Sequence, residues 1–285
     1  MNESSHRDWI GRSETVEELV TATPLKAMLA TLGRQTAENL PLEKVPPLWH
    51  WLYFLELASW HKLAADGHQQ RGVFLPPIDL PRRMWAGSEV QFYSPLLVNT
   101  ESRRVSTISN IEEKQGRSGN LAFVTVKHEI HCEDRLAITE TQTIVYREAA
   151  SNARPAGGQA APVDPDFTHT ISPDPLLLFR YSALTFNAHR IHYDRPYATE
   201  TEGYPGLVVH GPLLATMLMD LLLSQDPQAN IESFEFRAVK PVFDLAPFHV
   251  CGNKPNEDGL CELWIADADN TLCMRATAKL KSNEG

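Results

Sequence analysis

Hydrophobic and polar positions alternate or cluster along much of the chain in the manner of β-strands. Four stretches of the first half are rich in β-branched and aromatic residues and are separated by glycine or polar turns. They cover residues 89–93, 104–108, 121–130 and 136–146. We predict that these stretches form a long-stranded antiparallel sheet.

Each half of the chain also contains an apolar stretch that predicts a helix. Residues 46–58 start with prolines suited to a helix entrance and continue with a mostly apolar run, which predicts a partly buried helix. In the second half, residues 213–223 are apolar almost throughout and predict a buried helix. Further strand-like stretches follow that helix at residues 233–237, 247–251, 260–266 and 272–278.

The two halves therefore share one order of elements, a helix followed by strands, although few residues are identical between them. Small residues, glycine and proline separate the halves and predict an interdomain linker at residues 149–165. We predict an α+β fold with domains at residues 1–148 and 166–285, each a long antiparallel sheet wrapped around a central helix. Two unrelated α+β domains are the alternative.

The net charge and composition of the chain limit the kinds of molecule that it is expected to bind. The chain of 285 residues has a formal net charge of -10 and a pI near 5.6, which argue against nonspecific binding to nucleic acid or anionic membranes. The apolar stretch after Pro212 is interrupted by Asp220 and is short for a membrane span. Four cysteines without a CxxC pair, and a leader without a signal pattern, predict a reduced, cytoplasmic setting.

A base-rich loop lies shortly before the second-half helix. His192 can exchange a proton with water near neutral pH, because the ordinary pKa of imidazole is about 6.5. Asn187 offers an amide that can hold a water or a substrate without acting as a base. Asp194 would share a face with His192 in an extended chain and could fix the imidazole tautomer; a solvated aspartate before Pro196 is an equal alternative.

His189 adds a second imidazole, so His189, His192 and Asp194 also fit a two-histidine, one-carboxylate metal site. We favour a metal-free interpretation, because the helix that begins after His210 explains the chemistry more fully.

Gly211 leaves a backbone N–H free at the positive end of the helix dipole, where an oxyanion from a thioester carbonyl would be stabilised. A tight helix entrance is the purely structural alternative.

Longer strings of residues resemble a known family. Residues 186–194 and 203–212, with residues 8–14, 46–52 and 74–87, are similar to the double hot-dog members of the MaoC-like (R)-specific enoyl-CoA hydratases, which include the 3-hydroxyacyl-thioester dehydratases. The first-half strings look like the branch of mesaconyl-C4-CoA and itaconyl-CoA hydratases. The resemblance implies a double hot-dog fold, with a degenerate first half that covers the acyl or CoA groove, and no metal or redox cofactor.

The resemblance also implies roles for the residues of the loop. It places His192 on the catalytic histidine and Gly211 on the oxyanion glycine. Asn187 stands where the family usually has aspartate, and His189 with Arg190 replaces Asn-Pro. His192 is therefore expected to carry the proton chemistry and Asn187 to position water. The residues predicted to support them are Asp194, His189 and His210.

The implied reaction is reversible hydration of a short, branched, dicarboxylic enoyl-CoA, with water as the second substrate. Arginine suits a free carboxylate because its planar fork binds both oxygens, and other arginines could meet the CoA phosphates. The candidates are Arg180, Arg190, Arg195, Arg82 and Arg83. A 3-hydroxyacyl-ACP dehydratase, a noncatalytic acyl-CoA binding protein and a thioesterase are the alternatives, and both a monomer and a homodimer are open.

Overall fold

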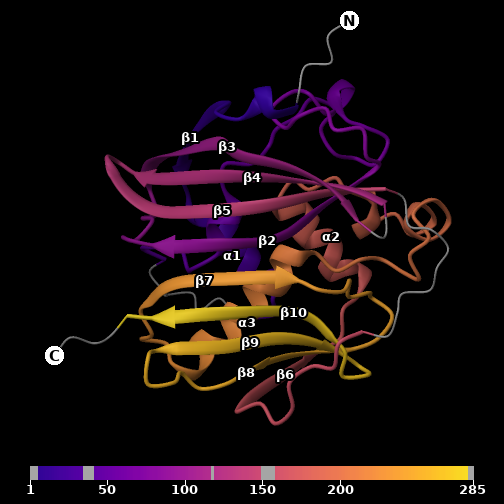
Figure 1. Cartoon of the computed structure of the whole chain (residues 1–285). Helices are drawn as coiled ribbons and strands as arrows, with labels where there is room; N and C mark the ends of the chain where they lie inside the picture. The colour runs from indigo at the N-terminus through magenta and orange to yellow at the C-terminus, as the bar shows by residue number, and fades with distance from the viewer. Residues whose placement is uncertain (1–5, 35–41, 117–118, 149–157, 282–285) are drawn as a thin grey trace, which may run out of the picture.

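One continuous antiparallel sheet runs through the molecule (Figure 1). The computed structural model describes residues 6–34, 42–116, 119–148 and 158–281. Within them, ten strands follow the order β1-β3-β4-β5-β2-β7-β10-β9-β8-β6. The strands are β1 (Ser13–Val20), β2 (Arg82–Phe92), β3 (Thr100–Gly116), β4 (Gly119–Cys132), β5 (Arg135–Arg147), β6 (Phe167–Ile171), β7 (Ile231–Ala238), β8 (Phe248–Gly252), β9 (Leu260–Asp267) and β10 (Leu272–Leu280).

The strand order repeats between the two halves of the chain. From the outer edge to the centre, the first half contributes β1, β3, β4, β5 and β2, and the second contributes β6, β8, β9, β10 and β7. β2 and β7 pair antiparallel at the centre, with Glu89 opposite Glu235. The predicted α+β double hot-dog fold is confirmed. The domain boundaries stay predictions, and residues 149–157 of the predicted linker lie outside the described residues.

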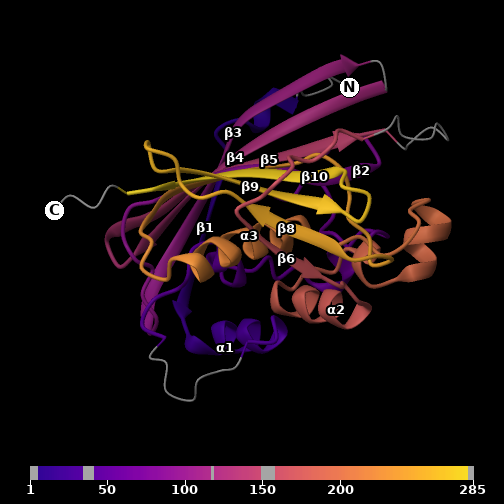
Figure 2. The same ribbon diagram turned by 90° about the horizontal axis from the view of Figure 1, so that it is seen from below.

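Three α-helices lie on the same side of the sheet (Figure 2): α1 (Ala22–Thr31), α2 (Pro175–Leu184) and α3 (Gly211–Gln225). α3 packs against β8, β9 and β10, and every residue from 213 to 220 is buried, as its apolar sequence predicts. Asp220 is the charged exception inside this helix, and it pairs with Arg34 at 3.0 Å. No helix in the described part of the chain is long and apolar enough to cross a bilayer.

The helix predicted at residues 46–58 is wrong. The segment forms only a short 3-10 helix, Trp49–Leu52, followed by extended chain. Leu48 and Phe54 adopt φ angles of 69° and 56°, which an α-helix does not allow. Most of the apolar side chains from Leu48 to Phe54 are nevertheless buried, because this part of the irregular segment packs into the core instead of coiling, whereas Leu57 is exposed. Among the described residues, the first half therefore lacks a central helix equivalent to α3.

The sequence patterns do not predict β1, β6, α1 or α2. β1 and β6 lie at the two edges of the sheet, and most of their side chains are exposed, so a buried period is absent. α1 and α2 are short helices of 10 residues each. α2 did carry a usable start signal, because the Asp174 side chain accepts a hydrogen bond from the Leu177 N–H at 2.8 Å and Pro175 follows it.

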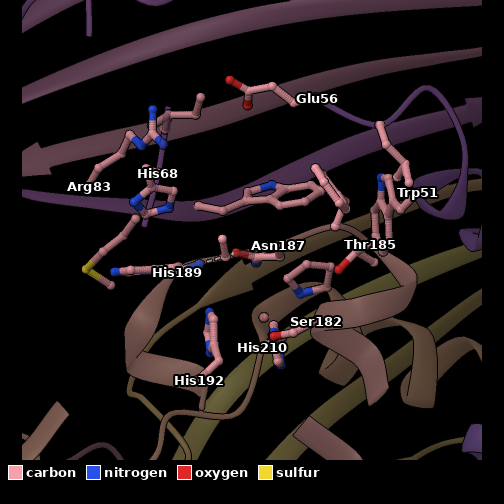
Figure 3. Close-up of a pocket in the computed structure, with 18 of the residues that line it drawn as sticks. Trp51, Glu56, His68, Arg83, Ser182, Thr185, Asn187, His189, His192 and His210 are labelled. Carbon is pink, nitrogen blue, oxygen red and sulfur yellow. Dashed lines mark hydrogen bonds between the residues drawn. The ribbon is translucent and has the colours of Figure 1, made fainter. Parts of the chain in front are cut away.

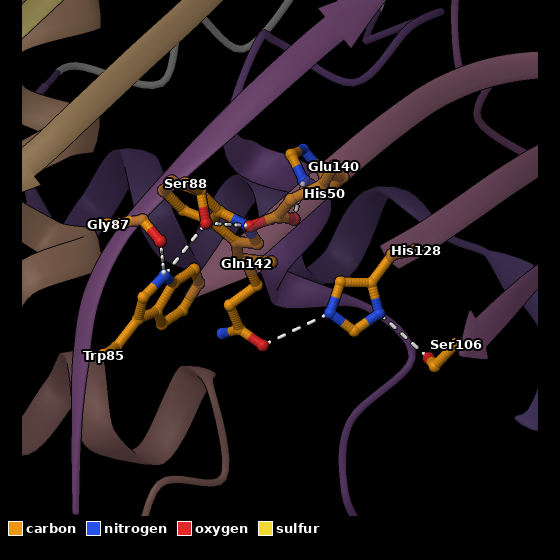
Figure 4. A network of polar contacts seen from close by, with 9 residues as sticks. His50, Trp85, Gly87, Ser88, Ser106, His128, Glu140 and Gln142 are labelled. Carbon is orange, nitrogen blue, oxygen red and sulfur yellow. Dashed lines mark hydrogen bonds and ion pairs between the residues drawn. The ribbon is translucent and has the colours of Figure 1, made fainter. Parts of the chain in front are cut away.

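A buried polar network anchors the irregular segment to the sheet (Figure 4). Glu140 on β5 accepts hydrogen bonds from the Trp51 indole at 3.0 Å and the Ser88 hydroxyl at 2.6 Å. Its other contact is the His50 Nε2 at 3.2 Å. Burial opposes ionisation, yet the hydrogen bond and charge of His50 lower the pKa of Glu140 to about 2. Glu140 thus joins the 3-10 helix to the centre of the first-half sheet.

Replacing Glu140 with glutamine is expected to lower the free energy of unfolding by about 3 kcal/mol, because it removes a buried carboxylate that three side chains contact. Chemical denaturation followed by circular dichroism measures this loss. Glu129→Gln is the matched control, since its ion pair with Lys127 is exposed and is worth less than about 1 kcal/mol. Equal losses in the two variants would contradict the anchoring role of Glu140.

Candidate active site

A cavity of about 1070 Å³ lies between the two halves of the molecule. One wall is the predicted catalytic loop, with Asn187, His192 and Gly211. The facing wall comes from the first-half sheet, including His128 and Gln142, together with the irregular segment. The first-half sheet borders this space because no central helix covers it in the described part of that half.

His192 lies at the end of a 3-10 helix, Arg190–His192, and points into the cavity (Figure 3). Its Nδ1 lies 2.7 Å from the carbonyl oxygen of Val208. Because a carbonyl only accepts hydrogen bonds, Nδ1 carries the proton and Nε2 keeps its lone pair. Burial lowers the pKa of His192 to about 4. The imidazole is therefore neutral near pH 7 and can act as a base.

His210 supports the ring of His192 from one side. The two imidazoles stack with their centroids 3.7 Å apart and their planes 18° apart. His210 Nε2 lies 2.9 Å from the hydroxyl oxygen of Ser182 on α2, and the Tyr181 ring contacts it edge-on at 4.9 Å. This packing restricts the rotation of His192, and the supporting role of His210 stays a prediction.

Asn187 lies in the turn that follows α2. Its backbone N–H donates to the carbonyl of Ser182 at 2.8 Å, and its Oδ1 accepts from the backbone N–H of His189 at 3.0 Å. The side-chain oxygen is thus occupied, while the amide NH₂ group stays available to a molecule in the cavity. Asn187 can donate to a water or a substrate but has no carboxylate with which to take a proton.

Gly211 is the first residue of α3 and lines the cavity. The backbone N–H groups in the first turn of a helix have no acceptor within the helix. No heavy atom lies within 4 Å of the position that a Cβ on Gly211 would take, so space beside the helix terminus is open. A negatively charged oxygen placed there would meet an N–H donor and the positive end of the helix dipole.

Asp194 does not orient His192, which corrects the prediction. Its carboxylate binds Arg190 at 2.7 and 2.9 Å and accepts a hydrogen bond from the Tyr197 N–H at 3.1 Å. The carbonyl of Val208 fixes the tautomer of His192 instead. Asp194 and Arg190 together stabilise the loop that carries the histidine.

Of the five predicted arginines, Arg83 alone lines the cavity. The guanidinium groups of the others have acceptors elsewhere in the protein. Arg180 donates to the carbonyl of Ala30, Arg190 pairs with Asp194, Arg195 with Asp244, and Arg82 with Glu202. The roles predicted for these four arginines stay predictions, and Arg83 is the candidate whose side chain lines the cavity.

A first-half loop, which the sequence did not point to, contacts the catalytic loop directly. The carbonyl of Asp66 accepts a hydrogen bond from the Arg190 N–H at 2.9 Å. His68 places its Nδ1 2.9 Å from Asp66 Oδ2, and its ring lies 4.0 Å from that of His189. The His189 ring is in turn 5.4 Å from that of His192. The first half thus contributes a carboxylate-histidine pair beside the predicted base.

The metal site considered from the sequence is not formed, because Asp194 points to Arg190. Asp66, His68 and His189 do place possible ligand atoms within 4.8 Å of one another. However, burial and then the positive charge of Arg83 lower the pKa of His68. The guanidinium of Arg83 repels a metal cation, whereas the Asp66 carboxylate, which acts on His68 in the opposite direction, attracts one.

The contact between the two loops depends on Gly67. Its φ is 92°, and a Cβ there would overlap the carbonyl of Ala188. Gly67→Ala is expected to displace the catalytic loop and lower kcat/KM for the enzyme's substrate about 100-fold, since small misplacements of catalytic groups are costly. Gly72→Ala is the matched control for backbone strain. Gly72 also has a positive φ, 83°, but a Cβ there would contact only the Pro77 side chain, at 3.7 Å. Equal values of kcat/KM for the two variants, measured by steady-state kinetics, would contradict this prediction.

A neutral histidine, an amide donor and a helix N-terminus around one cavity of a double hot-dog fit the chemistry of an acyl-thioester hydro-lyase. Residues 48–244 match the hydroxyacyl-thioester dehydratase type 2 family, and the chain belongs to this family. The predicted family and enzyme class are therefore confirmed.

Relatives extend over nearly the whole chain. Mesaconyl-C(4)-CoA hydratase of Chloroflexus aurantiacus is 47% identical over 281 residues, covering 98% of this chain and 99% of the relative. The mitochondrial hydroxyacyl-thioester dehydratase type 2 of Schizosaccharomyces pombe is 28% identical over 280 residues, covering 88% and 91%. A MaoC-like dehydratase from Phytophthora capsici shares the fold, with a TM-score of 0.69, 15% identity and coverage of 96% and 97%.

Proposed function

We propose that this enzyme catalyses the reversible hydration of a short, branched, dicarboxylic enoyl-CoA of the mesaconyl-C4-CoA type. The observation that carries the proposal is the neutral His192, with its Nε2 free, beside Asn187 and the N-terminus of α3 in one cavity. The 47% identity to a mesaconyl-C(4)-CoA hydratase supports the acyl group.

The reaction follows from the positions of three groups. The Gly211 N–H holds the thioester oxygen, which gains negative charge as a nucleophile adds to the β-carbon. Asn187 donates to the attacking water, and His192 Nε2 takes one of its protons while the hydroxyl bonds to the β-carbon. The resulting enolate then receives that proton at the α-carbon from the imidazolium, so one water is added and His192 returns to its neutral form. Dehydration reverses these steps.

The mouth of the cavity suits the pantetheine arm of a thioester. Exposed apolar side chains line it, namely Leu57, Trp60, Val73, Phe179 and Phe186. Because CoA and acyl-carrier-protein thioesters share this arm, a 3-hydroxyacyl-ACP dehydratase is the second candidate. A cytoplasmic location, and a monomeric or homodimeric state, are still predictions from the sequence.

The test incubates the purified protein separately with mesaconyl-C4-CoA, itaconyl-CoA and crotonyl-CoA and follows water addition by mass spectrometry. We expect the dicarboxylic thioesters to be hydrated with a higher kcat/KM than crotonyl-CoA. Turnover of crotonyl-CoA alone would contradict the proposal and indicate a hydratase of general enoyl-CoA metabolism. If none of the three is hydrated but an enoyl-ACP is, the carrier-bound alternative is correct.

A further inference from the structure

The positively charged side chains that line the cavity differ in whether a carboxylate of the protein balances their charge. Among the described residues that line it, Arg83, Arg104 and Lys240 carry a full positive charge. Lys240 pairs with Asp267 at 2.6 Å. Arg104 is surrounded by carboxylates that stabilise its charge, namely Glu14, Glu140, Glu56 and Glu18. Two of the three cations are therefore balanced by the protein itself.

Arg83 lacks such a balance. It is the second residue of β2, opposite Tyr146 on β5, and it forms no ion pair with a carboxylate of the described residues. The nearby Asp66 carboxylate is already bound by His68 through both the imidazole at 2.9 Å and the backbone N–H at 3.0 Å. A partly buried guanidinium without a counter-ion favours an anionic ligand.

The location of Arg83 fits the chemistry of the proposed substrate. Figure 3 shows Arg83, His68 and His189 following one another toward His192. In mesaconyl-C4-CoA, the free carboxylate is bonded to the same carbon that receives the hydroxyl. If the thioester oxygen lies at Gly211 and water lies at His192, that carboxylate extends past His192 toward His189 and His68.

We propose that Arg83 binds the free carboxylate of the substrate and makes the enzyme selective for dicarboxylic enoyl-CoA thioesters. This inference rests on the proposed hydratase function and specifies its substrate class. The planar fork of Arg83 can bind both carboxylate oxygens, while the Asp66–His68 pair forms the adjoining wall. Three of the other four candidate arginines pair with carboxylates of the protein, and Arg180 donates to a carbonyl, whereas Arg83 has no carboxylate partner among the described residues.

The test compares mesaconyl-C4-CoA with its methyl ester, which has the same carbon skeleton but no negative charge. For wild-type protein we expect kcat/KM to favour the acid. In Arg83→Gln, the ratio of kcat/KM for acid to that for ester is expected to fall about 10- to 100-fold, the range for a hydrogen bond to a charged group. Arg83→Lys, which keeps the charge but not the fork, should give an intermediate ratio.

Arg82→Gln is the matched control, because Arg82 is the neighbouring arginine but pairs with Glu202 and does not line the cavity. Its acid-to-ester ratio should equal that of the wild type. A ratio unchanged in Arg83→Gln, with both rates lowered in parallel, would mean that Arg83 is structural and would overturn the inference. If the wild-type protein hydrates both compounds equally, the inference that Arg83 binds the free carboxylate is wrong, but the proposed function stands. If the wild-type protein hydrates neither compound, the proposed function is wrong as well.

Discussion

Replacing His192 with alanine is expected to lower kcat for hydration about 100- to 10,000-fold, the usual contribution of a general base. His192 holds its proton on Nδ1 through the Val208 carbonyl and presents Nε2 to the cavity. Asn187, which lies beside it in the cavity, has no basic atom and cannot take the proton in its place. Stopped assays with mesaconyl-C4-CoA, together with circular dichroism to verify folding, measure the effect.

The pH dependence gives this prediction a second readout. Burial lowers the pKa of His192 to about 4, so the free imidazole persists through the neutral range. The wild-type kcat/KM should therefore be flat near neutrality and fall as the pH drops toward 4, where protonation removes the Nε2 lone pair. His169→Ala, on exposed β6, should keep full activity and the same profile. A folded His192→Ala protein with near-normal kcat would contradict the assignment of the base.

Replacing Gly211 with proline is expected to lower kcat about 100- to 1,000-fold, the usual effect of removing one oxyanion-hole donor. Proline removes the backbone N–H but suits the first position of a helix. The preceding residue, His210, already has an extended conformation with φ -62° and ψ 130°, which tolerates a following proline.

Gly211→Ala is the control for this change, because alanine keeps the N–H and its Cβ would meet no heavy atom within 4 Å. We expect it to keep most of the wild-type kcat in the same assay. If both variants are inactive, crowding at the helix terminus explains the loss, and if both are active, the Gly211 N–H does not stabilise the oxyanion. Activity of both variants would remove Gly211 from the mechanism, whereas inactivity of both would contradict the open space beside the helix terminus.

The predicted strands and α3 are present because their burial is regular. β4, for example, buries Ala122, Val124 and Val126 at alternate positions, and the middle of α3 is buried all round. Residues 46–58 are as apolar as a buried helix, but the side chains that are buried lie between Leu48 and Phe54, where the chain is irregular and both of these residues have positive φ angles. Composition alone does not distinguish these two ways of filling a core.

The candidate site was predictable where its residues lie close together in the sequence. Asn187, His192 and Gly211 belong to one loop and the helix after it, and all three line the cavity. The prediction for Asp194 assumed an extended chain, whereas residues 190–192 form a 3-10 helix that turns Asp194 toward Arg190. A two-residue spacing therefore did not put Asp194 on the face of His192.

The site residues that come from the first half of the chain could be identified only from the folded structure. Asp66 and His68 reach His189 only because their loop docks on the catalytic loop, at a distance of more than a hundred residues along the sequence. Arg82 and Arg83 are adjacent and chemically identical, yet one is paired with Glu202 and the other lines the cavity. Such differences depend on tertiary partners that a single sequence does not show.

The most direct test of the account follows the fate of water labelled with heavy oxygen during turnover of mesaconyl-C4-CoA. Hydration predicts one labelled hydroxyl on the β-carbon, an intact thioester and no release of free thiol. Labelled free carboxylic acid with stoichiometric release of CoA thiol would show hydrolysis of the thioester instead, and would contradict the role of His192, Asn187 and Gly211 as a hydratase site.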